Sequence, residues 1–128
     1  MSDEMGLLKT DVEIESHTLP GQRALLRQVL VATGAELSWA PATVLESLGI
    51  ARVKMVRFQQ ASGAVLERWV GFAVLRAADT VTTDEVVFGE PDDLVLLGAR
   101  TLEGMNLKVD LVGNRLVSAG PVLAAAAA

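Results

Sequence analysis

The chain of 128 residues contains no cysteine and only one histidine, His17. The lack of cysteine excludes disulfide bridges, thiolate nucleophiles and cysteine-based metal sites. A single histidine cannot form a histidine-rich metal site, and the sequence holds no nucleophile motif for it to activate. We therefore expect neither a metal nor an organic cofactor, and we assign His17 to a solvated surface position.

Long apolar runs and clusters of basic residues are also missing. No apolar run approaches the roughly 20 residues that a membrane-spanning helix needs, and the acidic residues 1–4 differ from the basic start of a signal peptide. The net charge is −5 and the 11 Lys and Arg residues are scattered, whereas phosphate binding needs clustered cations. The sequence thus predicts a soluble, cytoplasmic protein with no membrane segment in this chain and no nucleic-acid partner.

Apolar residues, in contrast, make up 51% of the chain. This content is enough to form a substantial core and argues against disorder of the whole chain. The length predicts one domain that spans residues 1–128. The alanine run at residues 124–128 is of low complexity, and we expect it to be a frayed end without a function.

The pattern of apolar residues predicts a mostly β fold. Residues 9–15 alternate apolar and charged side chains, as a half-buried strand does, with Val12 and Ile14 facing inward. Residues 23–31 are the predicted hairpin partner, across a turn at 19–22. Further strands are predicted at residues 52–60, 65–76, 81–88, 94–97, 107–111 and 115–118. Short helices are predicted at residues 41–48, begun by Pro41 and stopped by Gly49, and at residues 99–105. The result is an all-β, barrel-like domain with one or two short helices.

Residues 29–35, Val-Leu-Val-Ala-Thr-Gly-Ala, form the most informative segment. Three branched apolar residues lead into a small polar turn that begins at Ala32. With an aspartate in place of Ala32, the segment resembles the active-site loop of retropepsin-like aspartic proteases, whose signature is hydrophobic-hydrophobic-Asp-Thr-Gly-Ala. Thr33, Gly34 and Ala35 are in place, and the carboxylate that performs the chemistry is absent.

Two further motifs follow in the order that a retropepsin requires. The predicted hairpin turn at residues 61–64 carries Ser62 and Gly63 at its tip, where this family has its substrate-covering flap. Residues 96–98, Leu-Leu-Gly, run directly into a predicted helix and resemble the family's second hydrophobic-hydrophobic-Gly element. Residues 33–38, Pro41 and residues 48–50 also look like bacterial members of the family. The resemblance covers residues 8–117.

The resemblance implies a retropepsin-like acid protease barrel that acts as a homodimer. In this family two aspartates, one from each subunit, activate a water for peptide-bond hydrolysis, and the peptide or protein substrate lies extended under two flaps. By this resemblance Ala32 marks the position of the water-activating aspartate, and Thr33 and Gly34 support it. The implied substrate-binding residues are Ala35 and, at the flap tip, Ala61, Ser62, Gly63 and Ala64. The family needs no cofactor.

Alanine at position 32 predicts that this chain is catalytically inactive. No other aspartate replaces it, because Asp79 lacks both the preceding apolar run and the following Thr-Gly. One explanation is an engineered replacement of the catalytic aspartate, which the intact Thr33 and Gly34 favour. The other is a natural pseudoprotease that acts as a peptide-binding or dimerisation module. A third interpretation is an unrelated small β-barrel scaffold.

Aromatic and acidic residues near these motifs have simpler interpretations. Trp39, just past the active-site-like loop, is assigned to core packing rather than to substrate contact, and Phe58 to packing in the core or against the flap rather than to a binding platform. The acidic loop that contains Glu90, Asp92 and Asp93 is assigned to solvent rather than to a cation site.

Overall fold

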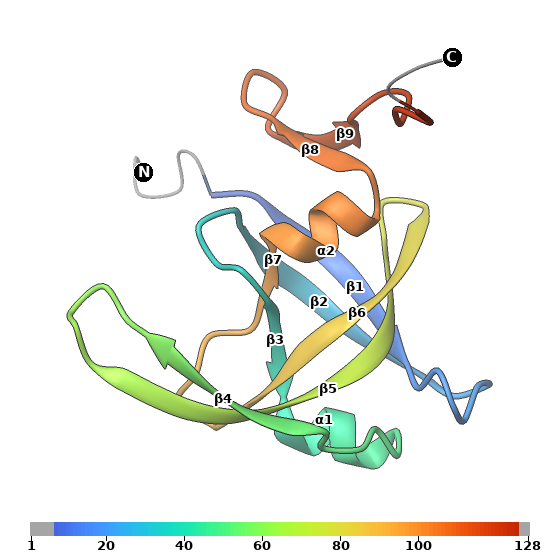
Figure 1. Cartoon of the computed structure of the whole chain (residues 1–128). Helices are drawn as coiled ribbons and strands as arrows, with labels where there is room; N and C mark the ends of the chain where they lie inside the picture. Colours follow the sequence, from blue (N-terminus) through green and yellow to red (C-terminus); the bar gives the residue numbers. More distant parts are fainter. Residues whose placement is uncertain (1–6, 126–128) are drawn as a thin grey trace.

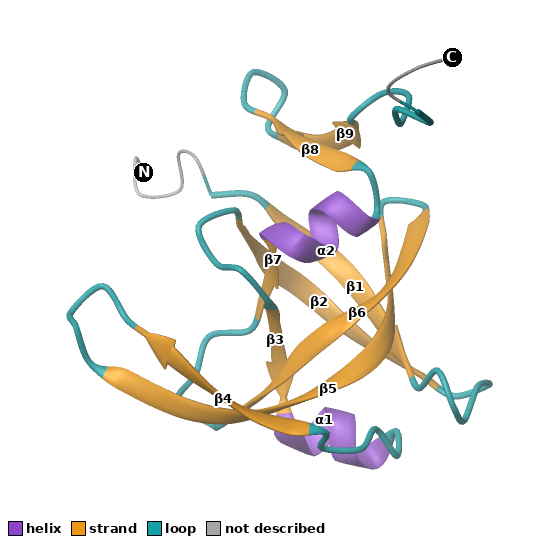
Figure 2. Cartoon of the chain, viewed as in Figure 1, coloured by secondary structure: helices purple, strands orange, loops and turns teal. Residues whose placement is uncertain are grey.

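A computed structural model describes residues 7–125 of the chain (Figure 1). In chain order the elements are β1 (Lys9–Glu15), β2 (Arg23–Ala32), β3 (Ser38–Pro41), α1 (Ala42–Ser47), β4 (Lys54–Gln59), β5 (Val65–Ala77), β6 (Thr80–Gly89), β7 (Leu96–Gly98), α2 (Ala99–Gly104), β8 (Leu107–Asp110) and β9 (Arg115–Ser118). Strands dominate the described residues and the two helices are short (Figure 2). The predicted β-rich, barrel-like fold class is therefore confirmed.

Within the described residues, six strands close into a barrel in the order β1-β2-β7-β3-β6-β5. Residues 13–15 of β1 pair antiparallel with residues 74–76 of β5 and complete the ring. The β2–β7 and β3–β6 pairs are parallel, whereas β1–β2 and β5–β6 are antiparallel. Strand β4 lies outside the ring and pairs only with the first part of β5. The β4–β5 hairpin consequently projects from the barrel (Figure 1).

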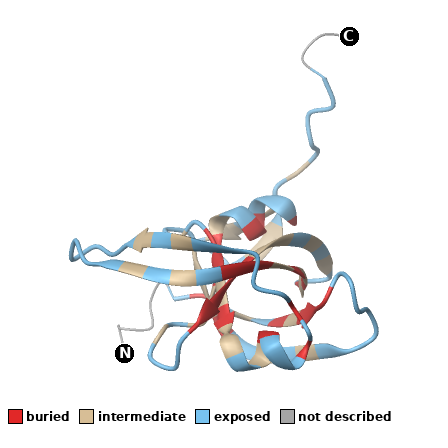
Figure 3. Ribbon diagram, turned by 60° about the horizontal axis from the view of Figure 1, so that its bottom comes forward, coloured by how far each residue is buried: buried red, intermediate tan, exposed pale blue. Residues whose placement is uncertain are grey.

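The core lies inside the barrel and consists mainly of buried residues from its strands and from the two helices. Figure 3 shows where the buried residues lie along the ribbon. Val12 and Ile14 of β1 are buried, as their alternation with charged residues predicts. The other large buried members of this cluster include Val29, Leu45, Leu75, Val86, Phe88, Leu97 and Leu102. A second, smaller cluster of Leu37, Val70 and Val87 lies at the base of the β4–β5 hairpin, and Trp39 and Phe58 pack against it.

The predicted hairpins are present, and their turns have the expected backbone. β1 and β2 form the first hairpin, and β8 and β9 form the last one. Gly63 has a φ of +94° in the turn between β4 and β5, and Gly49 ends α1 with a φ of +74°. Such positive φ values favour glycine because it has no Cβ.

Strand β3 (Ser38–Pro41) is absent from the sequence prediction, which assigned Pro41 to a helix. Pro41 has an extended backbone and ends β3, and α1 begins at Ala42. A four-residue strand is too short to show a period of two. Proline lacks an N–H donor for the strand ladder and is therefore tolerated at a strand end, where no further pairing is interrupted. The strand predicted at residues 94–97 is also shifted, because β7 begins at Leu96 and Leu94 is exposed.

The two helices in residues 7–125 are each six residues long, and neither has the length or apolar run needed to cross a membrane. In the predicted frayed end, Ala124 and Ala125 are exposed and have no regular secondary structure. Residues 126–128 lie outside the described part of the chain. The described residues after β9 lead away from the barrel (Figure 3).

Candidate functional site

The segment that resembles a protease active-site loop forms a tight turn at the end of β2. The N–H of Ala35 donates to the carbonyl of Ala32 at 3.0 Å. Thr33 and Gly34 are exposed at the turn, whereas Ala32 and Ala35 are partly buried. Residues 32–35 are called the Ala32 turn below. Ala32 is the last residue of β2, so the barrel fixes the position of its Cβ.

The Leu-Leu-Gly motif lies directly beside the Ala32 turn. Strands β2 and β7 pair in parallel so that Ala32 is opposite Gly98. The first N–H groups of a helix have no partner within the helix. In α2 the N–H of Ala99 donates to the carbonyl of Ala35 at 2.8 Å, and the N–H of Arg100 donates to Glu36 at 3.1 Å. Two motifs separated by more than sixty residues therefore form one hydrogen-bonded unit.

Gly98 is the point of closest approach within this unit. A Cβ at this position would lie 2.5 Å from the carbonyl oxygen of Leu37 and 3.0 Å from that of Ala35. Both atoms belong to the backbone, one in the Ala32 turn and one in the loop that follows it, so no side-chain rotation could relieve the overlap. Glycine is required here for space and not for its φ, which is −94°.

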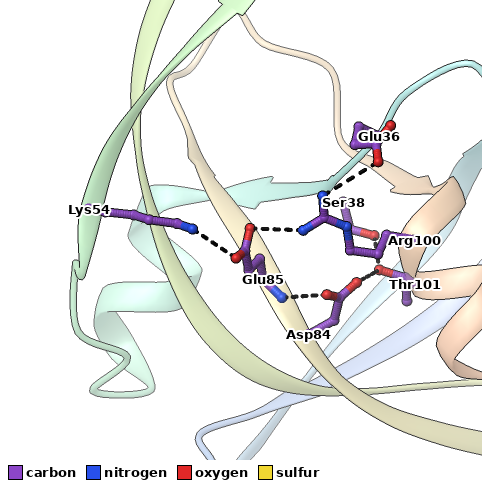
Figure 4. A network of polar contacts seen from close by, with 7 residues as sticks. All are labelled: Glu36, Ser38, Lys54, Asp84, Glu85, Arg100 and Thr101. Carbon is purple, nitrogen blue, oxygen red and sulfur yellow. Dashed lines mark hydrogen bonds and ion pairs between the residues drawn. The ribbon is translucent and has the colours of Figure 1, made fainter.

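Two buried hydroxyl groups, those of Ser38 and Thr101, link Gly98 to Asp84 by hydrogen bonds. This series of bonds is called the hydroxyl chain, and Figure 4 shows its side chains. The N–H of Gly98 donates to Ser38 Oγ at 2.9 Å, and Thr101 Oγ1 donates to Asp84 Oδ2 at 2.8 Å. Ser38 Oγ and Thr101 Oγ1 are 2.6 Å apart. An ionised carboxylate only accepts, so the proton of Thr101 is committed to Asp84 and Ser38 is the donor to Thr101. All bonds in the hydroxyl chain thus run in one direction, from Gly98 to Asp84.

Charged side chains extend this network to the solvent-facing side (Figure 4). Glu85 accepts from Lys54 Nζ at 2.8 Å and from Arg100 at 3.2 Å, and Arg100 also lies 3.4 Å from Glu36. These contacts join the base of β4, strand β6, α2 and the loop after the Ala32 turn. Lys54, Arg100 and Glu36 are exposed and Glu85 is partly buried, so each pair has at least one solvated partner and stabilises the fold only modestly.

A groove of about 500 Å³ lies between the Ala32 turn and the β4–β5 hairpin. Its lining consists of residues 34–37, Trp39, residues 58–60, Leu66, residues 92–94 and Leu96. Gly34 and Ala35 of the predicted site therefore face the same space as the arms of the predicted flap. The volume lies within the roughly 300–1,000 Å³ typical of ligand sites.

The predicted flap-tip residues are not part of this lining. Ala61, Ser62, Gly63 and Ala64 are all exposed, beyond the end of the groove. The N–H of Gln60 donates to the carbonyl of Ala64 at 2.8 Å and closes the turn. Ala32 and Thr33 also lie outside the lining, next to Gly34. The structure thus brings the turn and the hairpin arms together and leaves the tip projecting.

Two aromatic residues that the sequence analysis assigned to packing also line the groove. The rings of Trp39 and Phe58 are 5.0 Å apart and tilted by 56°. Both side chains pack on the second core cluster and are only partly buried. The alternation in residues 54–59 places Val56 and Phe58 on one face of β4. Since the sequence pattern predicts no strand at Trp39, no local feature indicates that the two rings meet.

The acidic loop before β7 was predicted to be solvated. The structure differs, because one of its carboxylates, that of Asp93, is mostly buried in an ion pair. Asp93 accepts two hydrogen bonds from Arg68 of β5, at 2.7 and 3.0 Å, and the two side chains are 12% and 13% exposed. The bond from Arg68 and a backbone N–H from Glu90 hold the pKa of Asp93 below its usual range, against the effect of burial. The ion pair ties the base of the β4–β5 hairpin to the loop.

Among residues 7–125, no group of three His, Asp or Glu side chains is arranged to bind a metal ion. Every buried side-chain polar atom in the same residues has a hydrogen-bond partner. In comparisons with known proteins, no protein-family model matches the chain, and no curated protein sequence matches it. The Ala32 turn, the groove and the β4–β5 hairpin are therefore the features of the molecule that bear on its function.

Proposed function

We propose that the chain is a retropepsin-like aspartic-peptidase domain that forms a homodimer and binds extended peptides. We also propose that alanine at position 32 leaves it unable to hydrolyse them. The observation that supports this proposal is that the Ala32 turn and the β4–β5 hairpin border one groove. The seating of the turn on Gly98 and α2 is a second support, because it joins the two motifs of the resemblance.

The chemistry explains why position 32 is decisive. Hydrolysis by this class of enzyme uses two carboxylates that share one proton, so that one activates water and the other polarises the carbonyl group. The chain carries one such turn, and a second copy, related by a two-fold axis, would supply the other. With Ala32 in both copies neither carboxylate is present. Loss of groups that act as a unit lowers the rate by about 10⁴-fold or more.

Peptide binding does not require these carboxylates. Extended peptides bind proteins through main-chain hydrogen bonds of the kind that join strands, and side-chain pockets provide specificity. Within residues 7–125, strand β4 has one unpaired edge, because it lies at the end of the sheet order. The groove beneath the hairpin arms offers room for side chains. Binding without cleavage is therefore the activity that we propose for the chain with Ala32.

The test is to place an aspartate at position 32 and compare it with asparagine. We expect Ala32→Asp to cleave a peptide library between about pH 3 and 7, the range in which a carboxylate pair shares one proton. Pepstatin should inhibit the cleavage, and activity per mole should rise with protein concentration as dimers form. Ala32→Asn has a similar shape without the charge and should stay inactive. A folded, dimeric Ala32→Asp that cleaves no peptide would refute the proposal.

A further inference from the structure

We propose that the groove selects extended peptides that carry a bulky apolar side chain with a lysine or arginine within two positions of it. This inference builds on the proposed peptide-binding function and adds the substrate class. It depends on two properties of the lining. The aromatic side chains of the groove pack against the second core cluster, and its ionisable side chains are all acidic.

The apolar part of the lining is pre-organised for a large side chain. The ring centroids of Trp39 and Phe58 lie 5.0 Å apart, and both side chains pack on the second core cluster. The rings are therefore held in place before any ligand binds. Leu66 and Leu96 are partly buried beside them, and Leu94 is 68% exposed at the rim. Aromatic rings give large apolar contact at little entropic cost when they are already fixed. A bulky apolar residue is therefore the expected anchor.

The ionisable side chains that line the groove are all acidic. They are Glu36, Asp92 and Asp93, and no lysine, arginine or histidine is among the lining residues. The negative charge of Asp93 is balanced by the guanidinium of Arg68, which donates two hydrogen bonds to it. Two carboxylates then remain, from two different loops. An apolar groove with excess negative charge attracts a cationic group and repels an anionic one.

Of the two remaining carboxylates, Asp92 is fully available to a ligand, whereas Glu36 shares Arg100 with Glu85 and is available only in part. Glu36 is 73% exposed and lies 3.4 Å from Arg100, which also pairs with Glu85. Asp92 is exposed and forms no ion pair with another residue in the described part of the chain. Lysine and arginine have long flexible stems that pack on apolar surface while the charged end reaches a carboxylate. In an extended peptide, residues two positions apart share one face, about 7 Å from each other, so an apolar and a basic side chain at this spacing face the groove together.

The test measures peptide binding by the chain with Ala32, which should bind without cleaving. Fluorescent decapeptides would carry a central Phe with Lys two positions away, the same peptide with Glu for Lys, and a third with Ala for Phe. At low salt we expect the Phe/Lys peptide to bind about tenfold more tightly than the Phe/Glu peptide, with a smaller ratio at 0.3 M salt because screening weakens exposed charges. The Ala/Lys peptide should bind more weakly than the Phe/Lys peptide.

Charge-neutral variants identify the residues responsible. Asp92→Asn combined with Glu36→Gln should reduce the Lys-over-Glu ratio at least threefold, and Leu94→Asn should reduce the Phe-over-Ala ratio. Asp79→Asn, an exposed carboxylate in the β5–β6 turn outside the groove, should change neither ratio. Circular dichroism would verify that each variant is folded.

The outcomes separate this inference from the proposed function. Equal binding of the Lys and Glu peptides, a ratio that the double variant leaves unchanged, or no binding of any peptide would overturn the inference. If Ala32→Asp cleaves peptides without a preference for basic neighbours, the proposed function stands and the substrate class is wrong. If basic–apolar peptides bind as expected and Ala32→Asp cleaves none, the groove selects them and the peptidase assignment fails.

Discussion

Gly98→Ala tests the seating of the Ala32 turn, because one methyl group would have to enter occupied space. The new Cβ would lie 2.5 Å from the carbonyl oxygen of Leu37, 2.6 Å from its carbonyl carbon and 3.0 Å from the carbonyl oxygen of Ala35. All three contacts are with backbone, so α2 or the loop must move. The movement would strain the bonds that α2 makes to the loop.

The expected loss follows from these contacts. Overpacking a well-packed site costs typically 1–3 kcal/mol, and three backbone overlaps place this change at about 3 kcal/mol. The lower entropy of the unfolded alanine chain offsets about 0.4–1 kcal/mol of that loss. A net loss of about 2–2.5 kcal/mol with an m-value of about 1.5 kcal/mol/M lowers the urea midpoint by about 1.5 M. Urea unfolding followed by circular dichroism measures this shift directly.

Gly34→Ala is the matched control in the same loop. A Cβ on Gly34 meets no heavy atom within 4 Å, and its φ is not in the left-handed region. The substitution should therefore leave stability unchanged or raise it by about 0.4–1 kcal/mol through the unfolded chain. If Gly98→Ala unfolded at the same urea concentration as the unmodified chain, Gly98 would not be packed against Leu37, and the joined arrangement of the two motifs would be refuted.

Two other substitutions test the polar contacts near the groove. Thr101→Val keeps the shape and interrupts the hydroxyl chain, so it should destabilise the fold by about 1–3 kcal/mol. Thr83→Val, on the exposed side of β6, should cost under about 0.5 kcal/mol. Equal losses of stability in Thr101→Val and Thr83→Val would contradict the stabilising role of the hydroxyl chain. Asp93→Asn should cost about 1.5–3 kcal/mol at pH 7 because it removes charged hydrogen bonds. Since folding lowers the pKa of Asp93, its contribution is present above its unfolded pKa of about 3.9 and is lost as the pH falls through the folded value. Urea unfolding at pH 7, 4 and 3 should show the gap to the unmodified chain narrowing, and a constant gap would contradict this assignment.

Local features of the sequence predicted the elements that depend on local physics. The alternation in residues 9–15 identified β1 and its buried Val12 and Ile14, because a strand side chain faces the core at every second position. Gly49 and Gly63 identified a helix end and a hairpin turn, because both need positive φ values. The position of the Ala32 turn at the end of β2 followed from the apolar run before it.

The arrangement of the groove depends on contacts between distant segments, which no local pattern carries. Strand β3 is only four residues long, and its neighbours β6 and β7 come from the second half of the chain. The meeting of Trp39 and Phe58 follows from that placement. The pairing of Arg68 with Asp93 likewise joins a strand to a loop 25 residues away, and the sequence offers several acidic partners of equal charge. Strand order, and not residue type, was the missing information.

Closure of the barrel has a consequence for how the protein folds. β1 meets β5 about sixty residues later in the chain, and β2 meets β7 at a similar separation. The entropy of closing such long loops is lost before the contacts form, so folding in about milliseconds to seconds is expected, slower than for helical bundles of this size. The Ala32 turn gains its support only when residues 96–100 have been synthesised and have docked. The site therefore assembles late, after most of the sheet that surrounds it.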